Sequence, residues 1–274
     1  SCYGCEVYIG FGRRREMTTK IHIGNCIEIM PTITDKFDLI ITSPPYDAEK
    51  DYEGIRNLQN YQNFAANWIR YIPKLLKLTG SFWLNLGYTK INQNETLPLT
   101  YLYYNIKPKE LKLIQEIVWH YEGGMSYKKR FTHRTERWMW FSLEPDNVYF
   151  NLDNISDISL NRTYDRRNHP LGKNPTDYWY FNRVVSGTGK VAEKTCHPCQ
   201  FPEKMIERII KGCCPIKGNV LDPFAGSGTV GKVSSRFNLD CTLIEIKSFY
   251  LYDIINSNQY EVIDPSCELS QPED

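Results

Sequence analysis

The stretch VLDPFAGSGTVG, residues 220–231, decides the fold that the sequence predicts. It reads as a short apolar strand that runs into a glycine turn and then into a helix near residues 229–237. Gly226 and Gly228 would let the backbone approach a ligand closely, and the helix would offer free N–H groups at its start. Glu245 ends the next predicted strand, 17 residues after Gly228, where its carboxylate could accept both hydroxyls of a ribose.

The same stretch also fits GxGxxG, the pattern of nicotinamide and flavin dinucleotide sites. The residues before the glycines distinguish the two kinds of ligand. Asp222, Pro223 and Phe224 would put a carboxylate and a bulky ring at the turn, where a pyrophosphate would need bare N–H groups. An acid at this position can pair with an amino group, which favours a zwitterionic ligand without phosphate. A dinucleotide and a simple helix-entry turn remain as alternatives.

A second stretch, TSPPY at residues 42–46, follows the apolar run FDLIIT at residues 37–42. The run is typical of a buried parallel strand. Ser43 and Pro44 each precede a proline, which restricts both residues to extended backbone. We expect a stiff loop at the carboxyl end of a strand, where α/β sheets place their ligand sites. An ordinary Pro-Pro turn is the alternative.

Such a loop suits chemistry on an exocyclic amino group of a nucleobase. The amino nitrogen is a poor nucleophile because its lone pair is delocalised into the ring. The Pro44 carbonyl and the Ser43 hydroxyl could accept its N–H bonds, favour a tetrahedral geometry and free the lone pair. Tyr46 could stack on the base, which is worth roughly 1–3 kcal/mol. That stacking would partly offset the few kcal/mol needed to flip a base out of a duplex.

Outside these two stretches, strand-like and helical patterns alternate, which favours a parallel α/β sheet. Helical spacing over residues 61–78 is interrupted by Pro73, where we expect a kink or break. The other predicted strands and helices occupy residues 81–87, 116–121, 137–142, 203–211, 219–222 and 241–246, with a last helix after them. Residues 144–190 lose this periodicity and are rich in Asn, Asp, Arg, Gly and Pro.

The composition is that of a globular protein, with 41% hydrophobic and 24% charged residues. The net charge is only +1, so any nucleic-acid binding must depend on local basic clusters. The sequence contains no run of about 18 apolar residues, so we expect no membrane span. The nine cysteines are scattered and no secretion signal is evident, which favours an intracellular protein with reduced thiols. We expect it in the cytoplasm of a prokaryote or the nucleus of a eukaryote.

TSPPY followed much later by LDPFAGSGT resembles the amino-directed DNA methyltransferases of restriction–modification type. The order, catalytic loop first and cofactor loop last, resembles the permuted β group. Ser43 at the first catalytic position resembles the cytosine-N4 enzymes, since adenine-N6 enzymes more often carry Asp. The resemblance covers roughly residues 20–260 and includes IHIGNC (21–26), RFTHRTERWMWFS (130–142) and KTCHPCQFPEKMIERII (194–210).

The resemblance implies a Rossmann-like seven-stranded methyltransferase sheet with helices on both faces. It implies S-adenosylmethionine as cofactor, no metal, and direct methyl transfer to N4 of a cytosine flipped out of double-stranded DNA. The implied catalytic residues are Ser43, Pro44, Pro45 and Tyr46. The implied cofactor-binding residues are Asn25, Cys26, Thr195, His197, Asp222, Pro223, Phe224, Ala225, Gly226, Ser227, Gly228, Thr229 and Glu245. The family often has Asp where Asn25 stands, although an Asn side chain can still form hydrogen bonds there.

The resemblance also divides the chain. We expect a flexible lead-in (1–20), a catalytic and cofactor-binding domain (21–143 and 192–263), a target-recognition insert (144–191) and an acidic tail (264–274). Two basic groups are candidates for contact with DNA phosphates or base edges. They are Lys128, Lys129, Arg130 and Arg134, and in the insert Arg162, Arg166 and Arg167.

Several other activities remain as alternatives. Methylation of adenine N6 uses the same fold, and related loops serve RNA or protein amide methylation. A DNA-binding module without catalysis is the non-enzyme alternative. Pro198-Cys199-Gln200 resembles the nucleophile motif of cytosine-C5 methyltransferases, but here it precedes the cofactor strand. Cys2, Cys5, Cys196 and Cys199 could formally bind zinc, although about 190 residues separate the two pairs.

Overall fold

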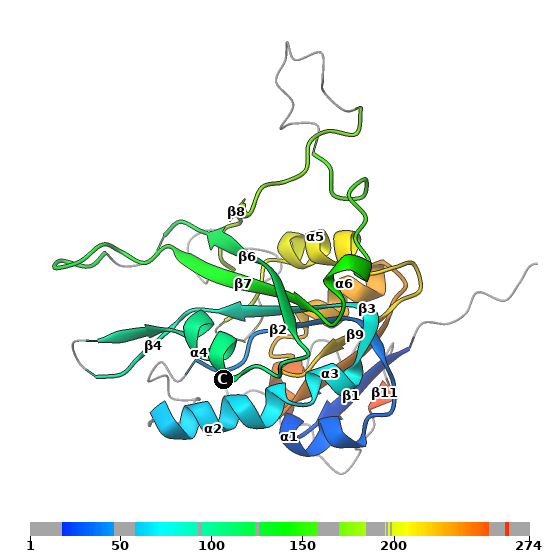
Figure 1. Cartoon of the computed structure of the whole chain (residues 1–274), viewed down its shortest axis with the longest axis horizontal. Coiled ribbons are helices and arrows are strands. Elements are labelled where there is room, and N and C mark those ends of the chain that lie inside the picture. Colours follow the sequence, from blue (N-terminus) through cyan, green and yellow to red (C-terminus); the bar gives the residue numbers. More distant parts are fainter. Residues whose placement is uncertain are drawn as a thin grey trace, which may run out of the picture.

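The computed structural model describes residues 18–46, 58–92, 95–123, 126–157, 170–184, 195, 197, 199–251 and 261–262. Most of the predicted lead-in and the whole acidic tail lie outside these residues, as do Arg162, Arg166 and Arg167. The described residues form one large sheet covered by helices (Figure 1).

The central sheet has nine strands in the order β11-β1-β10-β9-β2-β3-β7-β6-β8. From β11 to β3 neighbouring strands are parallel, whereas β7 is antiparallel to both β3 and β6. The predicted Rossmann-like sheet is therefore confirmed, with the short strands β8 and β11 added at its two edges. In sheet order, the strands are β11 (Glu261–Val262), β1 (Thr19–Ile23), β10 (Asp240–Glu245), β9 (Asn219–Asp222), β2 (Phe37–Thr42), β3 (Leu76–Leu86), β7 (Thr135–Ser142), β6 (Lys112–His120) and β8 (Tyr178–Tyr180).

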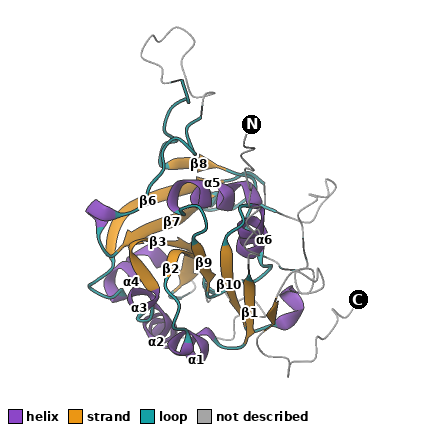
Figure 2. Cartoon of the chain, turned by 90° about the vertical axis from the view of Figure 1, so that its right-hand side faces the viewer, coloured by secondary structure: helices purple, strands orange, loops and turns teal. Residues whose placement is uncertain are grey.

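Helices cover both faces of this sheet (Figure 2). One face carries α1 (Cys26–Ile29), α2 (Leu58–Ile69), α3 (Ile72–Leu75) and α4 (Leu99–Ile106). The other face carries α5 (Glu203–Cys213) and α6 (Thr229–Arg236). Buried apolar side chains fill both interfaces, as the apolar runs in the sequence predict. None of the helices in the described residues is both long and apolar enough to cross a membrane.

The predicted helix over residues 61–78 is wrong at its carboxyl end. Helix α2 ends at Ile69, and Pro73 lies in the first turn of the separate helix α3. Proline is compatible with that position because the first N–H groups of a helix have no intrahelical partner. Leu76 then adopts extended backbone (φ −82°, ψ 139°), so residues 76–78 begin β3. A small antiparallel pair, β4 (Tyr88–Lys90) and β5 (Thr96–Pro98), follows β3.

The insert predicted to be irregular contributes strand β8 to the sheet. This strand pairs in parallel with β6. Its central residue, Trp179, is buried and stacks on Trp83 of β3, with ring centroids 5.7 Å apart. Packing of one large ring thus stabilises a three-residue strand that has too little periodicity to be predicted. Of the predicted last helix, the described residues contain only the 3-10 helix Ser248–Leu251.

Candidate functional site

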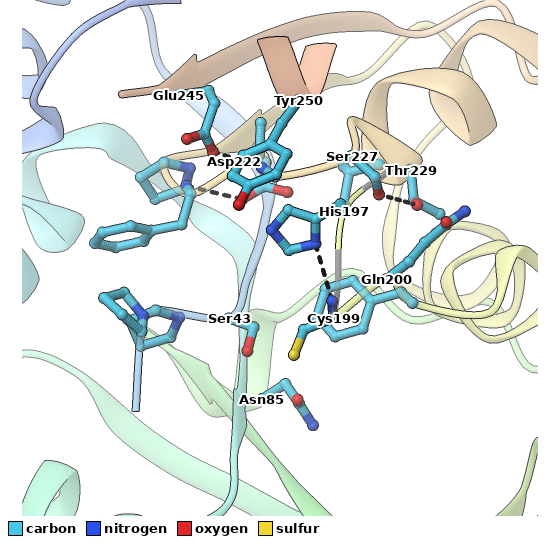
Figure 3. Close-up of a pocket in the computed structure, with 18 of the residues that line it drawn as sticks. Ser43, Asn85, His197, Cys199, Gln200, Asp222, Ser227, Thr229, Glu245 and Tyr250 are labelled. Atoms are coloured by element: carbon cyan, nitrogen blue, oxygen red, sulfur yellow. Dashed lines mark hydrogen bonds between the residues drawn. The ribbon is translucent and has the colours of Figure 1, made fainter. Parts of the chain in front are cut away.

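A pocket of about 430 Å³ lies at the carboxyl ends of the parallel strands. Both sequence motifs line it: Ser43–Tyr46 follow β2, and Asp222 ends β9, just before the glycine turn. In Figure 3, Ser43 and Asn85 lie at one end of the pocket, and Asp222 and Glu245 lie toward the other. Strand order explains this juxtaposition, because β2 and β9 are neighbours although about 180 residues separate their ends.

Two backbone N–H groups, one from the glycine turn and one from the loop after β10, hold the carboxylate of Glu245. Gly226 has a left-handed backbone (φ 52°), and its N–H donates to Glu245 Oε2 at 2.7 Å. The N–H of Lys247 donates to Oε1 of the same residue at 2.9 Å. Burial raises the pKa of Glu245, while these backbone donors act in the opposite direction. A carboxylate fixed in this way at the pocket wall can still accept further hydrogen bonds from ligand hydroxyls.

Asp222 joins the two motifs by hydrogen bonds. Its Oδ1 accepts from Thr42 Oγ1 at 2.7 Å and from the N–H of Phe224 at 3.0 Å. The side chain is almost completely buried, and this desolvation raises its pKa from 3.8 to about 7. A positively charged ligand group beside it would restore the ionised form. The buried carboxylate therefore suits a ligand that carries an ammonium.

The segment around His197 closes the pocket beside the glycine turn. The Cys199 N–H donates to His197 Nδ1 at 3.2 Å, so the neutral ring carries its proton on Nε2 (Figure 3). The ring meets Tyr250 edge-on, with centroids 4.5 Å apart. A Cβ on Gly226 would lie only 3.0 Å from His197 Nε2, so glycine is required for this close approach. Thr195 lies behind the pocket wall, where its N–H and Oγ1 donate to Gln200 Oε1 at 2.9 and 3.1 Å.

The TSPPY loop is held by a chain of hydroxyl hydrogen bonds. Ser43 Oγ donates to Tyr46 Oη at 2.9 Å. The Tyr46 hydroxyl lies 2.7 Å from Asn85 Oδ1 and 3.2 Å from Glu136 Oε2, and its single proton can serve either acceptor. Burial and the nearby Glu136 charge raise the pKa of Tyr46 well above its usual value, so the hydroxyl stays protonated. The Ser43 proton is thereby committed, while its lone pairs can accept from a ligand.

The loop is also fixed from outside the pocket. Tyr61 of α2 donates its hydroxyl to the Pro45 carbonyl at 2.8 Å. The ring of Tyr46 lies against Gly87, where an added Cβ would be 3.0 Å from Cε2. These contacts, together with the two prolines, restrain the loop, which the sequence predicts to be stiff.

Most residues predicted for the cofactor do line the pocket. Asn25 and Cys26 contribute from the start of α1, where Asn25 Oδ1 also caps the helix by accepting from Ile27 N–H at 3.1 Å. Gly228 and Thr195 are the two predicted residues that do not line it. Gly228 instead serves the turn itself, with φ 71° at the start of α6.

The sequence did not single out several side chains that also line this pocket. Asn85 and Glu136 contact the Tyr46 hydroxyl from β3 and β7, and Arg183 follows β8. A signal existed for Asn85, because a polar residue inside the apolar run SFWLNLG is unusual; it is 1% exposed. The other pocket-lining residues that the sequence did not single out are Gly24, Phe64, Trp119, Val184, Phe201, Val230, Ile244, Ile246, Lys247 and Tyr250.

The predicted DNA-contacting cluster of residues 128–134 lies outside the pocket, on the connection between β6 and β7, which projects beyond the sheet (Figure 1). Lys128, Lys129 and Arg130 are exposed there. The Arg130 guanidinium stacks on Tyr127 at 4.3 Å, and the neighbouring Phe131 is 99% exposed. The second predicted group, in the insert, lies outside the described residues.

No cluster of three or more His, Cys, Asp or Glu side chains that could hold a metal is present in the part of the chain that the structure describes. Of the four cysteines considered for zinc, only Cys199 belongs to that part. Its thiol is exposed and reduced, and the residue lines the pocket.

Comparison with known proteins adds family and fold. A family model described as DNA methylase (N6_N4_Mtase) matches residues 37–256. The type II methyltransferase M.ScaI of Streptomyces caespitosus is 38% identical over an alignment of 239 residues that covers 84% of this chain and 78% of the relative. The DNA adenine methyltransferase YhdJ of Escherichia coli K12 is 29% identical over 263 residues, covering 90% of this chain and 84% of the relative.

Two solved structures share the fold. The cytosine-N4-specific PvuII DNA methyltransferase superposes with a TM-score of 0.66 at 19% identity, covering 92% of this chain and 89% of its own. The Thermus thermophilus protein TTHA0409, solved in complex with S-adenosyl-L-methionine, superposes with a TM-score of 0.60 at 17% identity. That match covers 92% of this chain and 100% of the Thermus chain.

Proposed function

This chain belongs to the N6/N4 DNA methylase family, and from that membership together with Ser43 in the TSPPY loop we propose that it methylates N4 of a cytosine in double-stranded DNA. It is a DNA methyltransferase whose cofactor is S-adenosylmethionine. The cofactor supplies an electrophilic methyl group on a sulfonium. The protein's own residues must therefore hold the cofactor, orient the amino group and exclude water.

The residues around the glycine turn fit the cofactor. The Glu245 carboxylate, fixed by two backbone N–H groups, would accept the ribose hydroxyls. The ammonium of the methionine part would compensate the buried charge of Asp222. Asn25, Cys26 and the turn after Asp222 would line the same end. Thr195 would act from behind the wall, by holding the segment that carries His197 through Gln200.

The hydrogen-bond chain from Ser43 to Tyr46 is the observation that carries the proposed reaction. Because Ser43 donates to Tyr46, its oxygen presents lone pairs rather than a proton to a bound base. Together with the Pro44 carbonyl, it can accept the N–H bonds of an amino group and favour a tetrahedral nitrogen. The nitrogen can then attack the methyl group directly, so no covalent enzyme adduct and no strong general base are required. Catalysis rests mainly on positioning.

We assign cytosine as the target base from Ser43 at the first position of the loop. The PvuII enzyme, which shares this fold, is described as cytosine-N4-specific. Adenine N6 is the second candidate, because the relative YhdJ is described as an adenine methyltransferase.

The basic connection between β6 and β7 would contact DNA phosphates through Lys128, Lys129, Arg130 and Arg134. Its aromatic residues, among them the exposed Phe131, would buttress the duplex from which the base is flipped. Arg162, Arg166 and Arg167, in the insert proposed to read the target, would contact bases or phosphates.

Mass spectrometry of nucleosides from treated DNA tests the chemistry. We expect N4-methylcytosine; N6-methyladenine alone would establish the second candidate, and 5-methylcytosine would refute amino-group transfer. Ser43→Ala should lower turnover roughly a hundredfold, by analogy with removal of one preorganised hydrogen-bonding group. Its thermal shift with S-adenosylhomocysteine should be unchanged. Ser235→Ala, which removes an exposed serine hydroxyl on α6, is the matched control.

Tyr46→Ala should also lose most activity while the cofactor still binds, since stacking acts only on the base. Isothermal titration of the variant with S-adenosylhomocysteine measures that binding directly. Loss of cofactor binding in this variant would show that the loop serves the cofactor instead.

A further inference from the structure

Arg183 brings a buried hydrogen-bond donor to the pocket. The residue lines the cavity just after β8. Its Nε is buried and has no hydrogen-bond partner among the residues that the structure describes. The guanidinium carbon of Arg183 lies over the ring of Tyr121, 4.6 Å from the ring centre. This contact uses the face of the guanidinium, so the N–H groups at its edge can still donate to a ligand. A buried donor without an acceptor is unfavourable, so its presence in a pocket points to a ligand acceptor.

Strand register puts Arg183 at the same end of the pocket as the TSPPY loop. Trp119 lies directly opposite Glu136 in the β6–β7 ladder, and Glu136 contacts the Tyr46 hydroxyl. The segment that carries Arg183 is fastened to the end of β6, because Trp119 Nε1 donates to the Phe181 carbonyl at 2.7 Å. The charges of Glu136 and Arg183 also act in opposite directions on the pKa of the intervening Tyr121.

Among the described residues, the other basic side chains of the pocket, Lys247 and His197, lie toward its cofactor end. Lys247 lies two residues after Glu245, to which its backbone N–H donates, and its Nζ is 5.9 Å from the centre of the Tyr250 ring. His197 meets the same Tyr250 ring and the Gly226 turn. Arg183 is therefore the charged donor best placed to meet the substrate base.

Cytosine and adenine differ in what they would offer such a donor. Beside the N4 amino group of cytosine lie two adjacent acceptors, N3 and O2. Beside the N6 amino group of adenine lies N1, followed by a C–H group that accepts nothing. Arginine presents its donors in a planar fork that matches two adjacent acceptors, and enzymes read flipped bases through this edge.

We propose that Arg183 donates hydrogen bonds to N3 and O2 of the flipped cytosine and thereby selects it over adenine. The inference rests on the proposed function and adds the residue that determines the base. Both bases carry the same amino group, so the proposed contact adds recognition of the ring acceptors in which cytosine and adenine differ.

The test uses the full chain and a duplex carrying its target sequence, mapped first with the wild-type enzyme. Single-turnover rates are measured for target cytosine and for 3-deazacytosine, which keeps the amino group and O2 but lacks the N3 acceptor. The preference is the ratio of the rate on cytosine to the rate on 3-deazacytosine. Arg183→Met should reduce this ratio by roughly tenfold to a hundredfold, the range for loss of a hydrogen bond to a charged group. Arg183→Lys should restore part of it, because lysine offers a point charge without the fork.

Arg208→Met is the matched control. Arg208 also stacks on aromatic rings, 4.7 Å from Phe181 and 5.2 Å from Trp179, but it does not line the pocket. This variant should keep the wild-type preference. The thermal shift with S-adenosylhomocysteine should be unchanged in all three variants, which separates base recognition from cofactor binding and from loss of folding.

An unchanged preference in folded Arg183→Met, with N4-methylcytosine as the wild-type product, would overturn this inference and leave the proposed function intact. N6-methyladenine as the wild-type product would overturn both. If Arg183→Met does not fold, Arg183→Lys decides: a preference as large as that of the wild type would refute the bidentate contact.

Discussion

Asp222→Asn should make the cofactor-free protein more stable at neutral and alkaline pH. Burial raises the pKa of this carboxyl from 3.8 to about 7. Asparagine keeps an oxygen that can accept from Thr42 Oγ1 and Phe224 N–H, so both hydrogen bonds can survive the change. The variant therefore removes a buried charge and little else.

The sign follows from proton linkage. Between pH 4 and pH 7 the native state holds a proton on Asp222 that the unfolded chain has released, so unfolding becomes easier as pH rises through this window. A shift of about 3 units at about 1.4 kcal/mol per unit amounts to a loss of up to about 4 kcal/mol. The variant lacks this loss, so near pH 8 its free energy of unfolding should exceed that of the wild type by up to that amount.

Urea unfolding of both proteins at a series of pH values from 4 to 8 measures the difference. Their free energies of unfolding should agree near pH 4 and diverge as pH rises. Saturating S-adenosylmethionine should reverse the ranking near pH 8, because its ammonium stabilises only the ionised wild-type carboxylate. Parallel pH profiles without cofactor would refute the assignment of a raised pKa to Asp222.

Three further predictions concern the turn, the thiol and the basic connection. Gly226→Ala should weaken the thermal shift produced by S-adenosylhomocysteine, since φ is 52° and the new Cβ would lie 3.0 Å from His197 Nε2; an unchanged shift would mean that the turn does not bind the cofactor. Cys199→Ser should keep substantial methyl transfer with at most a modest change in cofactor KM, whereas complete loss of turnover with cofactor bound and 5-methylcytosine in the wild-type product would indicate a thiolate mechanism. Lys128→Ala combined with Lys129→Ala should reduce the slope of log binding constant against log salt by about 2, and an unchanged slope would exclude phosphate contacts there.

The sequence was a good guide wherever a strand leads straight into a motif. Apolar runs at residues 37–42 and 219–222 are strands in the structure, and the turns that follow them meet in one pocket. Both relations are local or follow from the ordering rules of parallel sheets. The roles of these residues in catalysis and cofactor binding remain predictions, which the variants above test.

Contacts between distant strands could not be predicted in this way. Glu136 reaches Tyr46 across 90 residues, and its position depends on the register of β7 against β6 and β3. Strand β8 is too short for its periodicity to be detected, and it forms because Trp179 packs on Trp83. The break before β3 could be predicted only in part. Pro73 indicates that the helix is interrupted, but it does not indicate that a strand follows.

Strand β8 also sets a boundary for re-engineering target specificity by exchange of sequence between relatives. Its stack on Trp83 and its pairing with β6 make residues 178–180 part of the scaffold, although they lie inside the segment that we assign to target reading. If the exchanged segment ends before residue 178, the chimera keeps the native sheet edge, and with it the correct placement of Arg183. If the exchanged segment extends beyond residue 180, the chimera changes the sheet edge together with the recognition sequence. A loss of activity could then not be attributed to altered target choice.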